Sequence, residues 1–214
     1  MKIVNLLSGG PAANWPTDIA SQFQQGVAVG IDRGALSLLK MGISPRAAVG
    51  DFDSVSASEF QQLQNQIKTI RRSEPIKDET DTELALQFAA KTYQPDRFRL
   101  FGFSGGRLDQ LLTNLLMVYK PAIRPLANRL ELIDRQNWGR FYLPGTHQIT
   151  KVPGMKYLDF VALEPLVLSL PDEKYQLDSF SVQHPTSFSS NEFLTNQASF
   201  TFDRGIMLVL QSCD

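Results

Sequence analysis

The chain of 214 residues has little of the chemistry that cysteine and histidine supply. Its single cysteine, Cys213, excludes an internal disulfide and a cysteine-ligated metal site, and it fits the reducing cytoplasm. With only two histidines, His147 and His184, the sequence disfavours a histidine metal cage and a histidine-dependent hydrolase triad. We therefore expect carboxylates to carry any polar chemistry.

The sequence also lacks an excess of charge and a long apolar run. Lysine and arginine number 21 against 22 aspartates and glutamates, so the net charge of -1 supplies no basic field for nucleic acid or an anionic membrane. The apolar stretch within "MKIVNLLSGG" is too short for a signal sequence or a membrane span. These absences predict a cytoplasmic protein that binds neither nucleic acid nor membranes and holds any anionic ligand with local groups.

Two common nucleotide-binding motifs are missing. No G-x-x-x-x-G-K-[ST] sequence is present, which excludes a P-loop enzyme. The absence of G-x-G-x-x-G argues against a Rossmann dinucleotide site. A nucleotide, if one binds, must be held by other elements.

Residues 1–127 alternate between short apolar runs and helix-like stretches. "VAVGID" followed by "GALSLLKMG" is typical of this alternation. Leucines at positions 108, 111, 112, 115 and 116 keep the spacing of one helical face. Strands and helices in turn predict crossover units, and hence an α/β domain with a parallel sheet.

The pattern changes to that of strands in residues 128–214. Runs such as "YLDFVAL", "LVLSL" and "IMLVLQ" are separated by turn signals. One of these, "FDRGI", predicts a hairpin between the strands on either side. We therefore expect a second, smaller, all-β domain that packs with the first, since no flexible linker is visible.

Polar residues gather where strands of the first domain are predicted to end, the edge at which open parallel sheets bind ligands. These residues are Asp32 and Arg33 in "GIDRGA", Asp51 and Asp53 in "VGDFDS", and Gly105, Gly106, Arg107 and Asp109 in "FGFSGGRLD".

The pair Asp51 and Asp53 indicates a metal. Alternate residues of an extended segment point the same way, so two like charges would lie together at a cost unless a cation joins them. Mg²⁺ prefers a few carboxylates together with substrate phosphates. Arg107, after two glycines, suits an anion that backbone amides approach closely.

Two other aspartates have simpler structural explanations. In "KDETDTELAL", Thr80 and Glu83 form an S/T-x-x-E capping box, and the helix dipole alone favours Asp81 in the first turn. Asp32, before a predicted helix, has the position of an N-cap. Both the structural and the functional interpretation of these residues stay open at this point.

Five motifs, in order along nearly the whole chain, resemble those of one enzyme family. "GIDRGALSLLKMGISPRAAVGDFDSVS", "KDETDTELAL" and "FGFSGGRLDQLLTNLL" are similar to the three signatures of the thiamine pyrophosphokinases. "DEKYQL" and "FSSNEF" resemble the K-Y/W-x-L and S-N-E elements of that family's β domain. The resemblance implies an α/β nucleotide-binding domain followed by a β-sandwich, and transfer of pyrophosphate from ATP to the hydroxyl of thiamine, with release of AMP. It also implies a homodimer with composite sites.

The resemblance further implies roles for individual residues. Asp51, Asp53 and Asp81 would hold Mg²⁺, Arg107 would clamp phosphate oxygens, and Asp32 and Asp109 would complete the catalytic pocket. The residues expected to bind ATP are Arg33, Lys77, Asp78, Gly105, Gly106 and Arg107. The residues expected to bind thiamine are Tyr175, by stacking on it, Ser190, by hydrogen bonding to its aminopyrimidine, and Asn191. Gln110 stands where many bacterial members have histidine.

Two other functions compete with this one. A related pyrophosphokinase acting on a hydroxymethyl pterin could use the same metal and ATP machinery, but the K-Y-x-L and S-N-E elements favour thiamine. A non-catalytic nucleotide- or thiamine-binding module would keep the fold, but we would expect it to lose acidic residues. All of them are present here.

Overall fold

The computed structural model describes residues 1–74 and 78–214 and contains two compact units, Met1–Arg135 and Gln136–Asp214. The sequence predicted a division after residue 127. The segment between that position and Arg135 contains strand β6, which pairs in parallel with β5 of the first unit.

Six parallel strands form the sheet of the first unit, in the order β6-β5-β1-β2-β3-β4. The strands are β1 (Ile3–Leu7), β2 (Val27–Ile31), β3 (Ala47–Gly50), β4 (Ile70–Arg72), β5 (Arg97–Phe101) and β6 (Leu130–Ile133). Every residue of β1, β3 and β6 is buried, as expected for strands that are covered on both faces.

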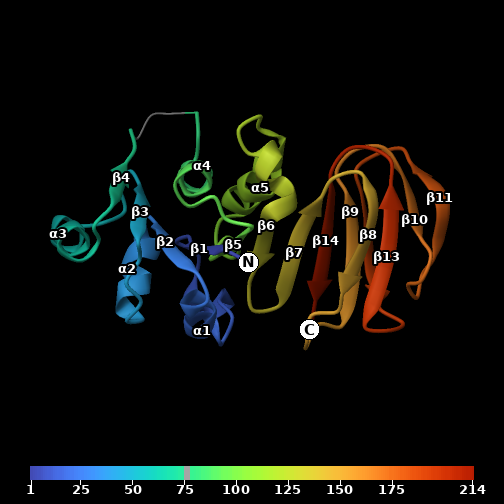
Figure 1. The fold of residues 1–214 in the computed structure, drawn as a ribbon, viewed down its shortest axis with the longest axis horizontal. Coiled ribbons are helices and arrows are strands. Elements are labelled where there is room, and N and C mark those ends of the chain that lie inside the picture. The colour runs from blue at the N-terminus through green and yellow to red at the C-terminus, as the bar shows by residue number, and fades with distance from the viewer. Residues whose placement is uncertain (75–77) are drawn as a thin grey trace. The chain divides into compact units, whose positions relative to one another are not determined.

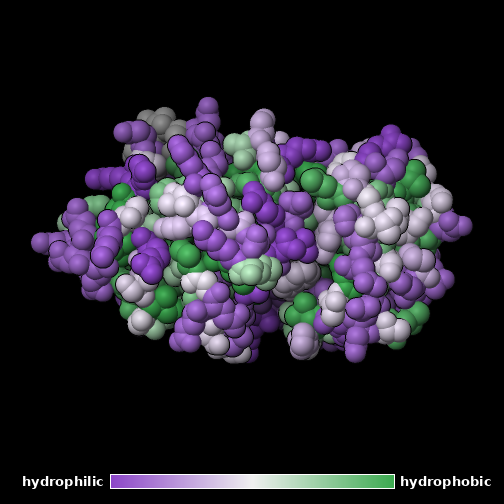
Figure 2. All heavy atoms as spheres, in the orientation of Figure 1, coloured by the Kyte–Doolittle hydropathy of each residue, from purple (hydrophilic) through white to green (hydrophobic). Residues whose placement is uncertain are grey.

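Helices cover both faces of this sheet (Figure 1). Successive side chains of a strand point to opposite faces, and on β4 the Arg71 guanidinium lies over Phe88 of α4 whereas that of Arg72 lies over Phe60 of α3. The helices are α1 (Ile19–Gln24), α2 (Arg33–Lys40), α3 (Ala57–Gln66), α4 (Asp81–Tyr93) and α5 (Leu108–Leu116), with 3-10 turns η1 (Ala12–Asn14), η2 (Met117–Tyr119) and η3 (Arg124–Arg129). Hydrophilic residues cover much of the face seen in Figure 2.

The strand order places a topological switch point between β1 and β5. From β1 the chain adds β2, β3 and β4 on one side, and then returns to place β5 and β6 on the other. Loops that leave the carboxyl ends of β1 and β5 therefore diverge and open a crevice, which is where such sheets bind ligands.

The second unit is a sandwich of two antiparallel sheets, ordered β12-β9-β14-β7 and β11-β10-β13-β8. Its strands are β7 (Asn137–Tyr142), β8 (Gly145–Thr150), β9 (Tyr157–Ala162), β10 (Leu166–Leu170), β11 (Leu177–Val182), β12 (Thr186–Glu192), β13 (Gln197–Phe202) and β14 (Met207–Ser212). Phe160, Phe200 and Phe202 are central in its buried core. The predicted fold class, an α/β unit followed by an all-β sandwich, is confirmed.

The hairpin predicted at "FDRGI" is wrong. β13 pairs with β8 and β10, whereas β14 pairs with β7 and β9 of the other sheet. The turn between them crosses from one sheet to the other, so that the apolar faces of the two strands pack against the same core from opposite sides.

Candidate functional site

A cavity of about 450 Å³ opens at the carboxyl ends of the strands in the first unit. Its walls come from the loops after β1, β2, β3 and β5 and from α5. The lining residues are Ser8, Gly9, Gly10, Pro11, Asp32, Arg33, Ser54, Gly102, Phe103, Gly105, Gly106, Arg107, Gln110 and Asn114. The cavity thus lies at the switch point, as the strand order requires.

Three carboxylates converge beside this cavity. Asp32 follows β2, Asp51 follows β3, and Asp81 is the first residue of α4. Each offers an oxygen, and these oxygens all lie within 4.8 Å of one another. Because all three side chains are half-buried, their mutual repulsion is only partly screened by water.

Asp32 has the most perturbed environment of the three. Its backbone adopts a φ of 47°, and its Oδ1 accepts a hydrogen bond of 3.2 Å from the Phe52 N–H. Burial, followed by the charges of Asp81 and Asp51, raises the pKa of Asp32 to about 7, against the lowering effect of the Phe52 N–H. Gly50 makes room for this carboxylate, because a Cβ there would lie 1.8 Å from Asp32 Oδ1.

Asp81 is fixed by the start of α4. The predicted capping box is confirmed: Thr80 Oγ1 accepts from the Glu83 N–H at 3.3 Å, and the Glu83 carboxylate accepts from the Thr80 N–H at 3.2 Å. The Ser73 hydroxyl donates to Asp81 Oδ1 at 2.9 Å. Because Thr80 caps the helix, the carboxylate of Asp81 joins the cluster instead of serving as a cap.

Asp53 has a different position from Asp51. Phe52 has a φ of 60°, so the segment is not extended there, and the argument from alternating side chains does not apply. The Asp53 side chain is exposed, and its backbone N–H donates to Asp51 Oδ1 at 3.0 Å. Within the described residues, the converging group of carboxylates does not include Asp53.

The glycine-rich loop after β5 is exposed and open to an anion. Gly105 and Gly106 both have positive φ angles, 82° and 87°. Arg107 donates from Nε to Asp109 Oδ1 at 3.1 Å, an ion pair that raises the pKa of Arg107 and lowers that of Asp109. The Arg107 guanidinium thus lies at the cavity wall, paired with the carboxylate of Asp109.

Of the other residues expected to bind ATP, Arg33 is the first residue of α2 and Asp78 precedes α4. Arg33 donates to the Ser54 carbonyl at 2.6 Å and so joins the loops after β2 and β3. Asp78 is exposed just before α4. Lys77 lies outside the described residues. Gln110 lines the cavity from α5.

The acidic cluster suits a hard divalent cation. Its donors are carboxylate oxygens from three separate segments, and the two neighbouring charges help to hold the pKa of Asp32 far above its usual range. A cation of charge two would remove that repulsion, and Mg²⁺ is commonly bound by a few carboxylates together with phosphate oxygens. These residues therefore fit the expected metal.

In the second unit, the two motifs expected to bind thiamine are joined by Asn191. This side chain is 3% exposed; its Oδ1 accepts from the Tyr175 N–H at 2.8 Å and its Nδ2 donates to the Tyr175 carbonyl at 2.9 Å. Tyr175 itself is 58% exposed. Ser190, also exposed, has a φ of 62° and donates its N–H to Asp159 Oδ1. Asn191 is thus placed to hold Tyr175, while Tyr175 and Ser190 face solvent.

Part of the cavity wall was not predicted from the sequence. Ser8–Pro11 line it directly after β1, and the glycine pair following a predicted strand was a usable signal. Asn114 is 6% exposed and donates to the Phe103 carbonyl at 3.2 Å, which ties α5 to the glycine-rich loop. A buried asparagine inside a leucine-rich helix gives no comparable warning in the sequence.

Comparison with known proteins connects both units to one family. Residues 22–130 match the family model "Thiamin pyrophosphokinase, catalytic domain", and residues 146–207 match "Thiamin pyrophosphokinase, vitamin B1 binding domain". The thiamine pyrophosphokinase of Bacillus subtilis is 31% identical over 217 residues, with both chains fully covered.

Two solved structures give the same picture. A thiamin pyrophosphokinase family protein from Enterococcus faecalis superimposes with a TM-score of 0.94 at 38% identity, and a protein from Lactobacillus plantarum with 0.91 at 47%, each over the full length of both chains. In the described part of our chain, no helix combines the length and apolar character needed to cross a membrane.

Proposed function

The chain belongs to the thiamin pyrophosphokinase family, and from this membership we propose that it transfers a pyrophosphoryl group from ATP to the hydroxyl of thiamine, giving thiamine diphosphate and AMP. The observation that carries the proposal is the convergence of Asp32, Asp51 and Asp81 beside a cavity at the switch point of the sheet. That arrangement can hold a metal ion against a polyphosphate.

We assign the metal site to Asp32, Asp51 and Asp81. Asp53, two residues after Asp51, is a further candidate ligand. Mg²⁺ bound there would neutralise charge on the polyphosphate, which is how phosphoryl transfer is generally promoted. The pKa of Asp32 is raised to about 7, so this carboxyl is partly protonated near neutral pH. It would lose that proton when it binds the metal.

The triphosphate would lie along the cavity. Gly105 and Gly106 allow backbone N–H groups to approach its oxygens, and Arg107 would exchange Asp109 for phosphate as a bidentate partner. Arg33 lines the same cavity, Asp78 precedes the helix that carries Asp81, and Lys77 completes the proposed set. Asp109, once released, could orient the attacking hydroxyl.

Thiamine would be recognised by the second unit. The exposed ring of Tyr175 offers a stacking surface, held in place by Asn191 and by Lys174, whose Nζ lies 5.4 Å from the ring centroid. Ser190 would hydrogen-bond the aminopyrimidine. Asn191 contributes through Tyr175, since its amide already binds that residue's backbone.

We further propose that two chains form a homodimer with composite sites in the cytoplasm. Support for association comes from α5, where Leu108, Leu112 and Leu116 follow one another at four-residue intervals and are 68%, 47% and 51% exposed. A second copy of the chain would cover such a face in a symmetric contact. The single cysteine fits a reducing compartment.

The decisive experiment incubates the protein with ATP, Mg²⁺ and thiamine and follows the nucleotide and thiamine products together. We expect AMP and thiamine diphosphate in equal amounts. ADP with thiamine monophosphate would refute pyrophosphoryl transfer, and turnover of a hydroxymethyl pterin in place of thiamine would move the chain to the related activity. Binding without turnover would indicate a non-catalytic module.

A further inference from the structure

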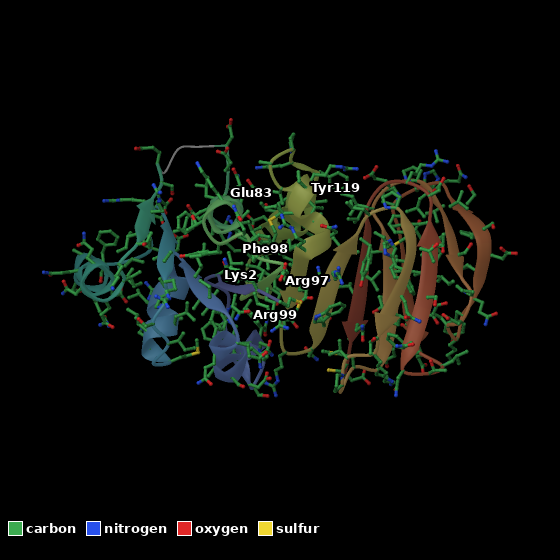
Figure 3. The ribbon with its side chains drawn as sticks, viewed as in Figure 1. Lys2, Glu83, Arg97, Phe98, Arg99 and Tyr119 are labelled. Atoms are coloured by element: carbon green, nitrogen blue, oxygen red, sulfur yellow. The ribbon has the colours of Figure 1, made fainter. Side chains whose placement is uncertain are left out.

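Lys120 lies at the end of η2, far in sequence from the acidic cluster, yet it contacts the segment that carries Asp81. Its Nζ donates to the carbonyl of Asp78 at 3.0 Å and to Glu83 Oε2 at 2.8 Å. Both acceptors flank Asp81 at the start of α4. Figure 3 shows Glu83 on α4 and Tyr119, the residue before Lys120, on the turn after α5.

Glu83 makes this contact unusual for a lysine near the surface. The Glu83 side chain is 1% exposed, whereas that of Lys120 is 44% exposed. Glu83 Oε2 also accepts from the Thr80 N–H, while its Oε1 is buried without a hydrogen-bond partner in the described residues. A buried carboxylate with one free oxygen depends strongly on the cation that it has.

The 3-10 turn η2, which precedes Lys120, follows directly from a helix that lines the cavity. η2 continues directly from α5, and its Met117 and Val118 are buried. α5 in turn places Gln110 and Asn114 at the cavity. Lys120 therefore connects the segment that follows α5 to the start of α4, the helix that carries Asp81.

We propose that Lys120 is a positioning residue for the metal site: by holding the Asp78 carbonyl and Glu83 together, it fixes the first turn of α4 and with it the carboxylate of Asp81. The proposal rests on the metal site assigned above. Groups that orient metal ligands typically contribute tenfold to a hundredfold to metal affinity. Lys120 is expected to contribute at the lower end, because Ser73 also holds Asp81.

The test measures Mn²⁺ binding by the loss of the free Mn²⁺ electron paramagnetic resonance signal, and so does not depend on turnover. Lys120→Met should weaken Mn²⁺ binding about tenfold. Since it leaves Glu83 charged and buried, the double variant Lys120→Met with Glu83→Gln removes that charge while glutamine keeps the capping box. The double variant should regain the urea midpoint of the wild type but not its Mn²⁺ affinity.

Two further variants complete the design. Lys120→Arg keeps donors for both acceptors and should restore Mn²⁺ affinity to within about threefold of the wild type if the donors, rather than the lysine itself, matter. Lys91→Met makes the same chemical change on an exposed residue of the last turn of α4 and should leave binding unchanged.

The outcomes separate the two proposals. Equal Mn²⁺ affinity in the wild type and the double variant would overturn the role of Lys120 while leaving the metal site intact. If Mn²⁺ affinity decreases in proportion to the urea midpoint of unfolding in every variant, Lys120 acts only as a stabilising contact. That result would also overturn its role as a positioning residue. If the wild type binds Mn²⁺ no better than Asp51→Asn, the metal site itself fails, and this role of Lys120 fails with it.

Discussion

At the scale of single residues, the site depends on backbone conformations that residues other than glycine seldom adopt. Asp32 and Phe52 both have positive φ, and Gly50, the last residue of β3, leaves the space that the Asp32 carboxylate fills. Such strain is kept only where surrounding structure enforces it, and it is concentrated at functional sites. Here it accompanies three carboxyl groups that lie close together, and burial together with their mutual repulsion raises the pKa of Asp32.

Removing one carboxylate should therefore cost activity far more than stability. Asp51→Asn is expected to lower kcat/KM for ATP by several orders of magnitude, because the charge that holds the metal is lost while the side chain keeps its shape. Asp18→Asn, on an exposed aspartate before α1, is the matched control. If the variant kept more than about a tenth of wild-type activity, the loss of transition-state stabilisation would be less than roughly 1.4 kcal/mol, and the assignment would be contradicted.

The raised pKa of Asp32 predicts how the metal-free protein responds to pH. The folded-state pKa is about 7 and the ordinary value is 3.8, so between these values the folded state binds more protons than the unfolded state. The free energy of unfolding should then fall as pH rises through this window, by up to about 1.4 kcal/mol per unit from this group, and level off above pH 7.

Asp32→Asn isolates this contribution. Measured by urea unfolding with a chelator present, the variant should be more stable than the wild type at pH 8, and the difference should vanish near pH 4. Glu173, whose pKa burial also raises to about 7, contributes equally to both proteins and cancels. A difference that is constant across this range would show that Asp32 is ionised throughout.

At the scale of secondary structure, the sequence predicted the first unit well because its signals are local. Runs such as "KIVNLL" and "VAVGID" are apolar enough for strands buried on both faces, and the capping box of α4 was visible in four residues. β12 was not predicted as a strand, since "TSFSSNE" is mostly polar and lies at the edge of its sheet. The prediction that β13 and β14 form a hairpin was wrong, because a turn motif does not determine which sheet the next strand joins.

The residues of the site likewise fall into those that could be predicted from local sequence and those that could not. Aspartates at strand ends could be found from sequence, because strand order brings the carboxyl ends together. The divergence of Asp51 and Asp53 could not, because it depends on the φ of Phe52. The contact between Lys120 and Glu83 joins residues 37 positions apart and has no local pattern.

The two capping boxes of the first unit offer a controlled test of what α4 does for the site. Thr80→Ala and Ser56→Ala remove equivalent caps from α4 and α3, and each should lower the free energy of unfolding by about 1 kcal/mol. Only Thr80→Ala should also reduce activity, severalfold or more, because α4 carries Asp81. Equal effects of the two variants on kcat/KM would show that activity follows overall stability instead.

At the scale of the whole molecule, the residues proposed for ATP and for thiamine lie in different compact units. Those for ATP and metal fall within Met1–Arg135, and those for thiamine within Gln136–Asp214. A two-fold axis could bring the second unit of each chain to the first unit of its partner and so create two equal sites. The exposed leucines of α5 are the natural place to disturb such an association.

Complementation between two inactive variants tests that arrangement. One variant carries Asp51→Asn, and the other carries Tyr175→Ala with Ser190→Ala. If sites are shared between subunits, each heterodimer contains one doubly damaged site and one intact site, so activity should return when the two are mixed. With random exchange of equal amounts, half of the dimers are mixed and about a quarter of all sites are intact, which sets the expected recovery near a quarter of wild-type activity. Subunit exchange is verified separately by mass spectrometry of differently labelled chains. Persistent inactivity after proven exchange would mean that each chain builds its own site, because a site within one chain is always damaged in either variant, whichever partner it has.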